Sequence, residues 1–321
     1  MDKNILTIAT TKKLYVDMAV NLARSFLYWH PDSNIKFKLV TDQKKLVPND
    51  IIDRIEIVEI LSDELGKGFS PKLHLDKLAP AGQTLFIDSD CLIYGNLLPI
   101  FEKFKGHHVS VIGNYIADGE WFGDIAAICK KFNIKHLPKF NGGIYYLENG
   151  PVAAQVYETA RELEKQYDNI GFVRFRGYPA DEGLMALSMQ LNNQEPIVDD
   201  GTIMSDPLSC PGHYMTNVIK GENYLINPPA PHPLHQNWYP FTKISPLVVH
   251  FLGHHSMDYQ YQKDIYRLKK QNTGQLNFIA ETRALILIEF KKRLELFLKY
   301  KFRKIYHSLF GVRQIKPSER L

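Results

Sequence analysis

The chain has 321 residues, of which 45% are hydrophobic, 12% aromatic and 23% charged, and these proportions exclude a disordered or fibrous protein. Its charge is unevenly distributed. Residues 290–321 hold ten Lys and Arg against two Glu, which leaves 29 basic and 33 acidic residues upstream. The sequence therefore predicts a mildly acidic body with a strongly basic end.

Strand and helix patterns alternate along the first half of the chain. An apolar strand at 5–9 is followed by an amphipathic helix at 14–27, then by strands at 35–39 and 54–60. A short helix at 71–78 leads to a buried strand at 84–87, and a further strand is expected at 109–112. This alternation predicts an open α/β sheet with helices packed on it.

The second half of the chain is less regular. Residues 114–140 follow no clear period, a strand is expected at 144–147, and helices are expected at 151–167 and 181–189. Residues 207–246 are rich in proline and aromatic residues and resemble a lid more than a separate domain. A late apolar strand at 248–252 precedes the C-terminal part of the chain.

The cysteines and the hydrophobic segments favour a cytoplasmic location. Cys91, Cys129 and Cys210 form no paired spacing, which favours a reducing compartment and argues against a cysteine-built zinc site. The first residues lack the apolar core of a signal peptide, and no apolar stretch approaches the ~18–20 residues that cross a bilayer. We expect neither secretion nor a membrane span.

Two acidic residues follow the buried strand at 84–87. Asp88 and Asp90 would lie at the carboxyl end of that strand, where ligands gather in open α/β sheets. Residues two apart in an extended turn can direct two carboxylates to one hard cation such as Mn²⁺ or Mg²⁺. The alternative is an ordinary acidic turn, because Asp and Ser are favoured turn residues.

A histidine closes the late apolar strand. His250 would supply an imidazole at a strand end, and Gly253 would let the backbone approach a phosphate without a Cβ in the way. The alternative is a histidine that only forms hydrogen bonds beside a turn glycine. Two carboxylates and one imidazole would leave several positions of an octahedral cation open for diphosphate oxygens.

Taken together, six segments resemble the GT-A-fold glycosyltransferases of family 8, the group of glycogenin and the bacterial lipooligosaccharide galactosyltransferases. The resemblance spans about residues 5–257 in the family's motif order. The segments are 8–11 with Tyr15, then 70–74, 86–90, 140–145, 181–183 and 249–253. It implies a mixed, mainly parallel sheet with helices on both faces in residues 1–265, followed by a helical, basic, amphipathic extension in 266–321.

The resemblance also implies a site and its cofactors: Mn²⁺ or Mg²⁺, and a nucleotide sugar, most simply UDP-linked, as donor. It assigns the metal to Asp88, Asp90 and His250, and catalysis to Asp181 and Glu182. It assigns the nucleotide sugar to Ala9, Thr11, Tyr15, Lys72, Asp88, Ser89, Asn141, Gly142, Gly253 and His255. Asp118 and Asp124 are weaker candidates for sugar hydroxyl contacts.

Three positions depart from the family pattern. Ser256 stands where the family has a diphosphate-binding lysine, so His255 or Lys72 would take over that contact. Glu182 replaces a glutamine near the anomeric carbon, and Lys12 replaces an asparagine after the first strand. Family 8 retains anomeric configuration, and a carboxylate at Glu182 allows a covalent route as well as attack on the face of departure.

The C-terminal segment has apolar residues at helical steps between many lysines and arginines. Such a helix can lie in the interface of an anionic bilayer; docking on its own domain or binding nucleic acid are the alternatives. No base-reading motif supports nucleic acid. We expect peripheral attachment to the cytoplasmic membrane face. Family members with similar C-termini act on lipooligosaccharide, which implies a glycan or lipid-linked acceptor, as in lipopolysaccharide biosynthesis.

Two other functions remain open from the sequence. A haloacid-dehalogenase-type phosphatase also begins with a strand ending in D-x-D, and Asp199 and Asp200 resemble its late acidic pair. That family usually has Thr or Val where this chain has Leu92. A degenerate nucleotide-sugar-binding protein is the second alternative, suggested by Ser256.

Overall fold

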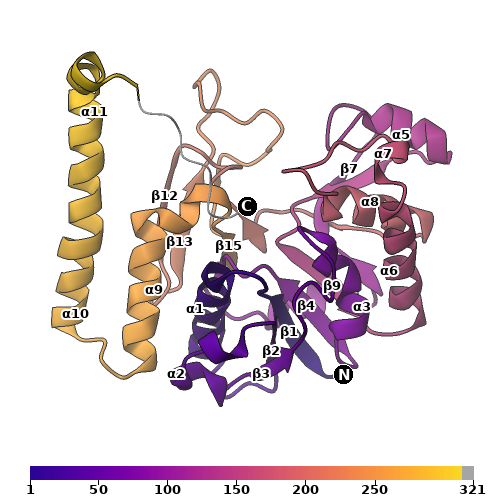
Figure 1. The fold of residues 1–321 in the computed structure, drawn as a ribbon, viewed down its shortest axis with the longest axis horizontal. Helices are drawn as coiled ribbons and strands as arrows, with labels where there is room; N and C mark the ends of the chain where they lie inside the picture. The colour runs from indigo at the N-terminus through magenta and orange to yellow at the C-terminus, as the bar shows by residue number, and fades with distance from the viewer. Residues whose placement is uncertain (313–321) are drawn as a thin grey trace.

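The computed structural model describes residues 1–312 and is built around a six-stranded sheet (Figure 1). Its strands lie in the order β3 (Glu56–Glu59), β2 (Lys36–Thr41), β1 (Lys3–Ile8), β4 (Gln83–Ile87), β9 (Ile144–Glu148) and β6 (Val109–Ser110). The first four are parallel, and β9 runs antiparallel to both of its neighbours. The carboxyl ends of β1, β2 and β4 therefore meet at one edge of the sheet.

Helices cover both faces of this sheet because its central strands are apolar on both sides. Ile5 and Leu85 belong to one hydrophobic cluster, whereas Leu6 and Phe86, the next residues of the same strands, belong to another. The first cluster is completed by α1 (Lys13–Trp29) and α4 (Leu98–Phe104), the second by α3 (Leu75–Leu78), α6 (Pro151–Glu164) and α8 (Asp181–Leu191). The expected mainly parallel sheet with helices on both faces is confirmed.

A small sheet joins the middle of the chain to its late strand. Here β15 (Val248–His250) runs antiparallel to β5 (Cys91–Ile93) and parallel to β11 (Met204–Ser205). In this register His250 faces Cys91, and the N–H of Phe251 donates to the carbonyl of Asp90 over 3.0 Å. The pairing fixes the histidine beside the acidic turn that follows β4.

The segment expected to be irregular at 114–140 is ordered, and that expectation was wrong. It contains the end of β7 (Ile112–Ile116), helix α5 (Ile125–Phe132) and β8 (Leu137–Phe140), and β7 pairs with both β8 and β10 (Ile197–Val198). Asp124 caps α5 by accepting the N–H of Ala127, which gives this acid a structural duty. Helix α5 does carry a helical pattern that the sequence analysis overlooked, with Ile125, Ile128 and Cys129 buried on one side, whereas β8 has only four residues.

The proline-rich region at 207–246 also contains strands. A three-stranded antiparallel sheet is formed by β12 (His213–Asn217), β13 (Glu222–Ile226) and β14 (Lys243–Ile244). It buries Tyr214, Leu225 and Ile244 in a third hydrophobic cluster, which it shares with Leu92 of β5 and Val249 of β15. The other short helices are α2 (Asn49–Ile52), α7 (Tyr167–Ile170) and 3₁₀ helices at Lys44–Leu46, Ser70–His74 and Gly253–Met257.

Residues 278–310 form a C-terminal arm beside the body. Helix α9 (Tyr259–Asn272) packs against α1, and the chain then turns into α10 (Phe278–Arg283), a π-helical segment (Ala284–Phe290) and α11 (Lys291–Phe310), which stands apart in Figure 1. The basic residues Arg313, Lys316 and Arg320 lie outside the described residues. Within residues 1–312, no helix is both long and apolar enough to cross a membrane.

Candidate active site

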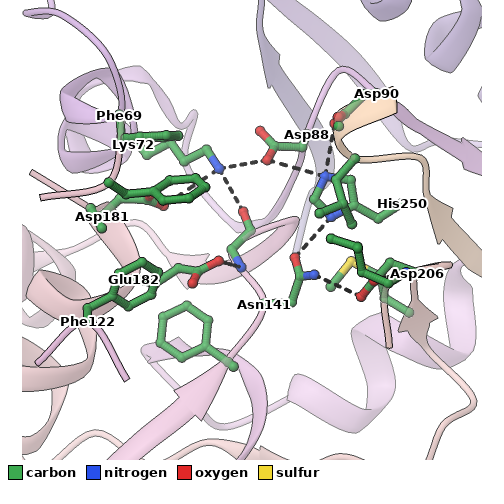
Figure 2. A pocket seen from close by; sticks show the side chains of 18 of the residues that line it. Phe69, Lys72, Asp88, Asp90, Phe122, Asn141, Asp181, Glu182, Asp206 and His250 are labelled. Carbon is green, nitrogen blue, oxygen red and sulfur yellow. Dashed lines mark hydrogen bonds and ion pairs between the residues drawn. The ribbon is translucent and has the colours of Figure 1, made fainter. Parts of the chain in front are cut away.

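A cavity of about 1,210 Å³ opens at the carboxyl ends of β1 and β4 (Figure 2). Most of the predicted site residues line it: Thr11, Tyr15, Lys72, Asp88, Ser89, Asp90, Asn141, Gly142, Asp181, Glu182, His250 and Gly253. Four predicted residues are not part of the lining: the weaker candidates Asp118, which is exposed, and Asp124, which caps α5, and also Ala9 and His255. Ala9 is buried at the end of β1, and the imidazole of His255 lies 2.8 Å from the carboxylate of Asp258.

The two acids after β4 and the histidine that ends β15 lie together on one side of the cavity (Figure 2). The Nε2 atom of His250 is 3.0 Å from Oδ1 of Asp90 and 3.8 Å from Oδ2 of Asp88. Asp90 and His250 are buried, whereas Asp88 is half-buried. Residues 160 positions apart in the sequence are thus brought to one point by the β5–β15 pairing.

The negative charges of Asp88 and Asp90 shift the pKa of the groups around them. Burial raises the pKa of Asp88, an effect that Lys72 opposes and Asp90 reinforces. Burial alone would lower the pKa of His250, but the neighbouring carboxylates of Asp90 and Asp88 raise it above its usual value. The raised pKa values of Asp88 and His250 both reflect excess negative charge in a buried place. A cation bound close to the three side chains would offset that charge.

The donor atoms suit a hard or borderline divalent cation. Carboxylate oxygens and one imidazole nitrogen are the ligands expected for Mn²⁺ or Mg²⁺. The Sγ atom of Cys91 also lies within 4.8 Å of ligand atoms of Asp90 and His250. Burial and the charges of Asp90 and Asp88 raise the pKa of this thiol well above its ordinary value, so it stays protonated and is a poor metal ligand.

Lys72 links the acidic turn to the start of α8. Its ammonium group donates to Oδ2 of Asp88 over 2.7 Å and to the carbonyl of Gly142 over 2.9 Å, and it lies 3.6 Å from Oδ2 of Asp181. The hydroxyl of Tyr145 donates to the same Asp181 oxygen over 2.5 Å. Burial lowers the pKa of Lys72, but Asp181 and Asp88 more than offset this, so the lysine stays charged.

Glu182 lies on the opposite side of Asn141 from the histidine (Figure 2). The N–H of Gly142 donates to its Oε1 over 2.6 Å. A Cβ at Gly142 would lie 3.0 Å from atoms of both Asp181 and Glu182, so glycine lets the loop approach these acids. Burial and the neighbouring Asp181 raise the pKa of Glu182 to about 7. This carboxyl therefore changes its charge near neutral pH.

The loop after β1 forms another part of the lining. Thr11 has a positive φ of 69°, and its N–H donates to both carboxylate oxygens of Asp42 over 3.0 and 3.1 Å. Tyr15 stands in the first turn of α1, next to this loop. The contact with Asp42 holds Thr11 in a left-handed conformation that non-glycine residues seldom adopt. Asp42 follows β2, and sequence reasoning did not single it out.

Sequence reasoning also missed part of the lining. Asp206 follows the two-residue strand β11, which is too short to be recognised by a pattern, and its carboxylate accepts from the amide of Asn141. An aromatic wall also lines the cavity, and half of its residues come from the segment expected to be irregular: Phe69, Trp121, Phe122, Phe140, Phe175 and Tyr178. The rings of Phe69 and Phe175 are stacked 5.7 Å apart, and Phe122 meets Phe175 edge-on.

No family model and no curated protein matches the sequence. Solved structures do. A complex of the galactosyltransferase LgtC with donor and acceptor sugar analogues superposes with a TM-score of 0.54 and 12% identity, covering 85% of this chain and 96% of that one. An active-site mutant of LgtC, in which glutamate replaces glutamine, gives a TM-score of 0.51 at 13% identity, over 78% of this chain and 87% of that one.

The bifunctional glycosyltransferase WbbM is similar over 86% of this chain and 52% of its own, with a TM-score of 0.50 and 10% identity. Identities this low establish the fold and nothing finer. The chain therefore has the GT-A glycosyltransferase fold, as expected from its sequence.

Proposed function

We propose that the chain is a metal-dependent, retaining glycosyltransferase similar to family 8, which moves a hexose from a UDP-sugar to a glycan or lipid-linked glycan. One observation carries the proposal: His250 lies 3.0 Å from Asp90 and 3.8 Å from Asp88 in the cavity of a GT-A fold. A nucleotide-sugar donor needs such a cation site, because negative charge develops on the oxygen of the departing nucleoside diphosphate and must be stabilised.

Asp88, Asp90 and His250 would hold the cation in this proposal. When bound, Mn²⁺ or Mg²⁺ would supply Lewis-acid stabilisation of the departing diphosphate. Lys72 is already committed to Asp88 and Asp181 and would orient both carboxylates. Tyr15 and Thr11, at the carboxyl end of β1, would contact the nucleoside part of the donor.

Glu182 and Asp181 would act at the sugar. In a covalent route, an Oε atom of Glu182 forms a bond to the anomeric carbon while the bond to the diphosphate oxygen breaks, and UDP leaves with the electron pair. An acceptor hydroxyl then attacks that carbon while its proton passes to an oxygen of the departed diphosphate, and the bond from the carbon to Glu182 breaks, which frees the carboxylate. In the other route the hydroxyl attacks directly, on the face from which UDP leaves. The first route is identified if mass spectrometry shows that the donor alone adds the mass of one hexose to the wild-type enzyme but not to the variant Glu182→Gln.

The acceptor would lie against the aromatic wall. A cavity of about 1,210 Å³ exceeds the range of about 300–1,000 Å³ that is usual for one small molecule, so there is room for a sugar acceptor beside the donor. Flat apolar rings with polar neighbours suit the mixed faces of sugars. In LgtC, donor and acceptor sugar analogues are bound together.

The C-terminal arm would attach the enzyme to an anionic membrane surface. Every residue of α11 is at least partly exposed, including Phe297, Phe302 and Leu309 at 57%, 49% and 70%. Lysines and arginines stand between these apolar residues, and each basic residue near an anionic surface contributes about 1 kcal/mol. The double change Phe297→Ser and Phe302→Ser should weaken sedimentation with anionic vesicles. Unchanged sedimentation would contradict membrane attachment.

Turnover tests the proposed reaction. We expect Mn²⁺-dependent UDP release from at least one of UDP-glucose, UDP-galactose and an N-acetylated UDP-sugar. Asp90→Asn should abolish this release, because it removes a charged ligand from the cation site. UDP binding without turnover would favour the degenerate binding protein. The GT-A fold gives the phosphatase alternative no support, and phosphate release from a phosphomonoester alone would be needed to revive it.

A further inference from the structure

Asp206 is a buried acid that the reaction proposed above does not use. It is 3% exposed, and its Oδ1 accepts the N–H groups of Leu208 and Ser209, both over 2.8 Å. Its Oδ2 accepts the hydroxyl of Ser209 over 2.7 Å and the side-chain amide of Asn141 over 3.1 Å. Three contacts from its own loop fix this carboxylate, so the fourth contact orients the amide rather than the acid.

The amide of Asn141 can take only one orientation. Its Nδ2 faces a carboxylate oxygen of Asp206, which only accepts, and its Oδ1 faces the backbone N–H of Gly143 over 2.9 Å, which only donates. Turning the amide over would place two acceptors together at Asp206 and two donors together at Gly143. The network therefore settles the assignment of oxygen and nitrogen.

The same oxygen decides which nitrogen of His250 carries a proton. Oδ1 of Asn141 lies 2.9 Å from Nδ1 of the histidine, and an amide oxygen can only accept, so Nδ1 must be the donor. Nε2 then points at Asp90 and Asp88 with its lone pair available in the neutral ring. The ring also lies close to Gly143, where a Cβ would be 2.7 Å from Nδ1, so glycine leaves the space that the ring occupies.

We propose that Asp206 is a positioning residue of the metal centre: through Asn141 it holds His250 in the tautomer that presents Nε2 to the cation. The inference rests on the proposed function, since it requires a cation at this point. Hydrogen bonds to the second nitrogen of a ligand histidine set its tautomer and ring orientation, and their loss costs about 10–100-fold in metal affinity. Asn141 would then orient His250 as well as contact the donor sugar.

Metal affinity tests this without turnover. Mn²⁺ is titrated into the protein without donor, and free Mn²⁺ is read by electron paramagnetic resonance. Asp206→Asn should weaken binding about 10–100-fold. Asp199→Asn, the matched loss of a carboxylate that lines the same cavity and accepts from Gly201, should not. The double variant Asn141→Asp and Asp206→Asn, called the exchange below, swaps the carboxylate and the amide. It again provides an amide donor at 206, a carboxylate at 141 and an acceptor for Nδ1 of His250, so it should recover most of the affinity.

The outcomes separate the two proposals. If wild-type protein binds no Mn²⁺, the metal centre and this inference both fall. If it binds Mn²⁺ and Asp206→Asn binds equally well, or the exchange remains as weak as the single variant, only the inference is overturned. Nitrogen-15 spectra of the histidines in Mg²⁺-loaded wild-type protein need no variant to fold. We expect the proton of His250 on Nδ1, and a proton on Nε2 would contradict the proposal.

Discussion

Replacing Lys72 with methionine should expose how strongly its charge stabilises the site. The lysine side chain is 14% exposed, and its ammonium group lies 2.7 Å from Asp88 and 3.6 Å from Asp181. Removing one partner of a buried ion pair costs about 3–5 kcal/mol, because the remaining charge is left uncompensated. With an unfolding entropy of about 2.1 cal/mol/K per residue, this corresponds to a fall in Tm of about 4–7 °C for a chain of this length.

Differential scanning calorimetry in the presence of a chelator measures this fall directly. The control is Lys165→Met, because Lys165 and Glu162 form an ion pair in which both side chains are more than 60% exposed. Such a pair contributes at most about 1 kcal/mol, which is about 1.5 °C here. Mn²⁺ should raise the Tm of Lys72→Met more than that of the wild type, since a cation would replace the charge beside Asp88. Equal melting of the two variants, or equal Mn²⁺ effects, would refute the reasoning.

Two further substitutions test other parts of the site. In metal-free protein Glu182 has a pKa of about 7 in the folded state and 4.5 as its ordinary value, so the folded state holds the extra proton and this group's contribution to stability falls as pH rises between them. The Tm of Glu182→Gln relative to wild type should therefore be higher at pH 8 than at pH 5; a constant difference would contradict the raised pKa. Gly143→Ala places a Cβ 2.7 Å from Nδ1 of His250 and should weaken Mn²⁺ binding at least about tenfold. Gly150→Ala has open space around its Cβ and serves as the control, and equal losses in both would remove the geometric argument.

The central sheet could be predicted from the sequence because its signals are local. Apolar runs such as Leu85–Ile87 need only a few neighbouring residues to be recognised, and both faces of β4 are buried. The acidic turn after β4 and the histidine at the end of β15 were each readable as strand-end residues. The resemblance implied that these residues lie together, but no pattern in the sequence showed how. In the structure the β5–β15 pairing brings them together.

The rest of the site depends on contacts that leave no periodic signal. Asp206 follows a strand of two residues, and its role appears only when the amide of Asn141 lies within hydrogen-bond distance. Asp42, which follows β2, accepts the N–H of Thr11, which follows β1, so this contact joins the ends of two strands. The aromatic wall was hidden because its residues come from separate, mostly irregular segments, and Phe140 of β8 both packs in the core and lines the cavity. Tertiary contacts, more than local preference, decide such segments.

The position of one bound cation tests the whole account most directly. A crystal of the protein soaked with Mn²⁺ and UDP, measured at a wavelength that reveals manganese by anomalous scattering, locates that ion. We predict a single strong peak in direct contact with Asp88 or Asp90, His250 and the diphosphate. A manganese peak elsewhere in the cavity, or UDP bound there with these side chains contacting no cation, would contradict the proposed centre.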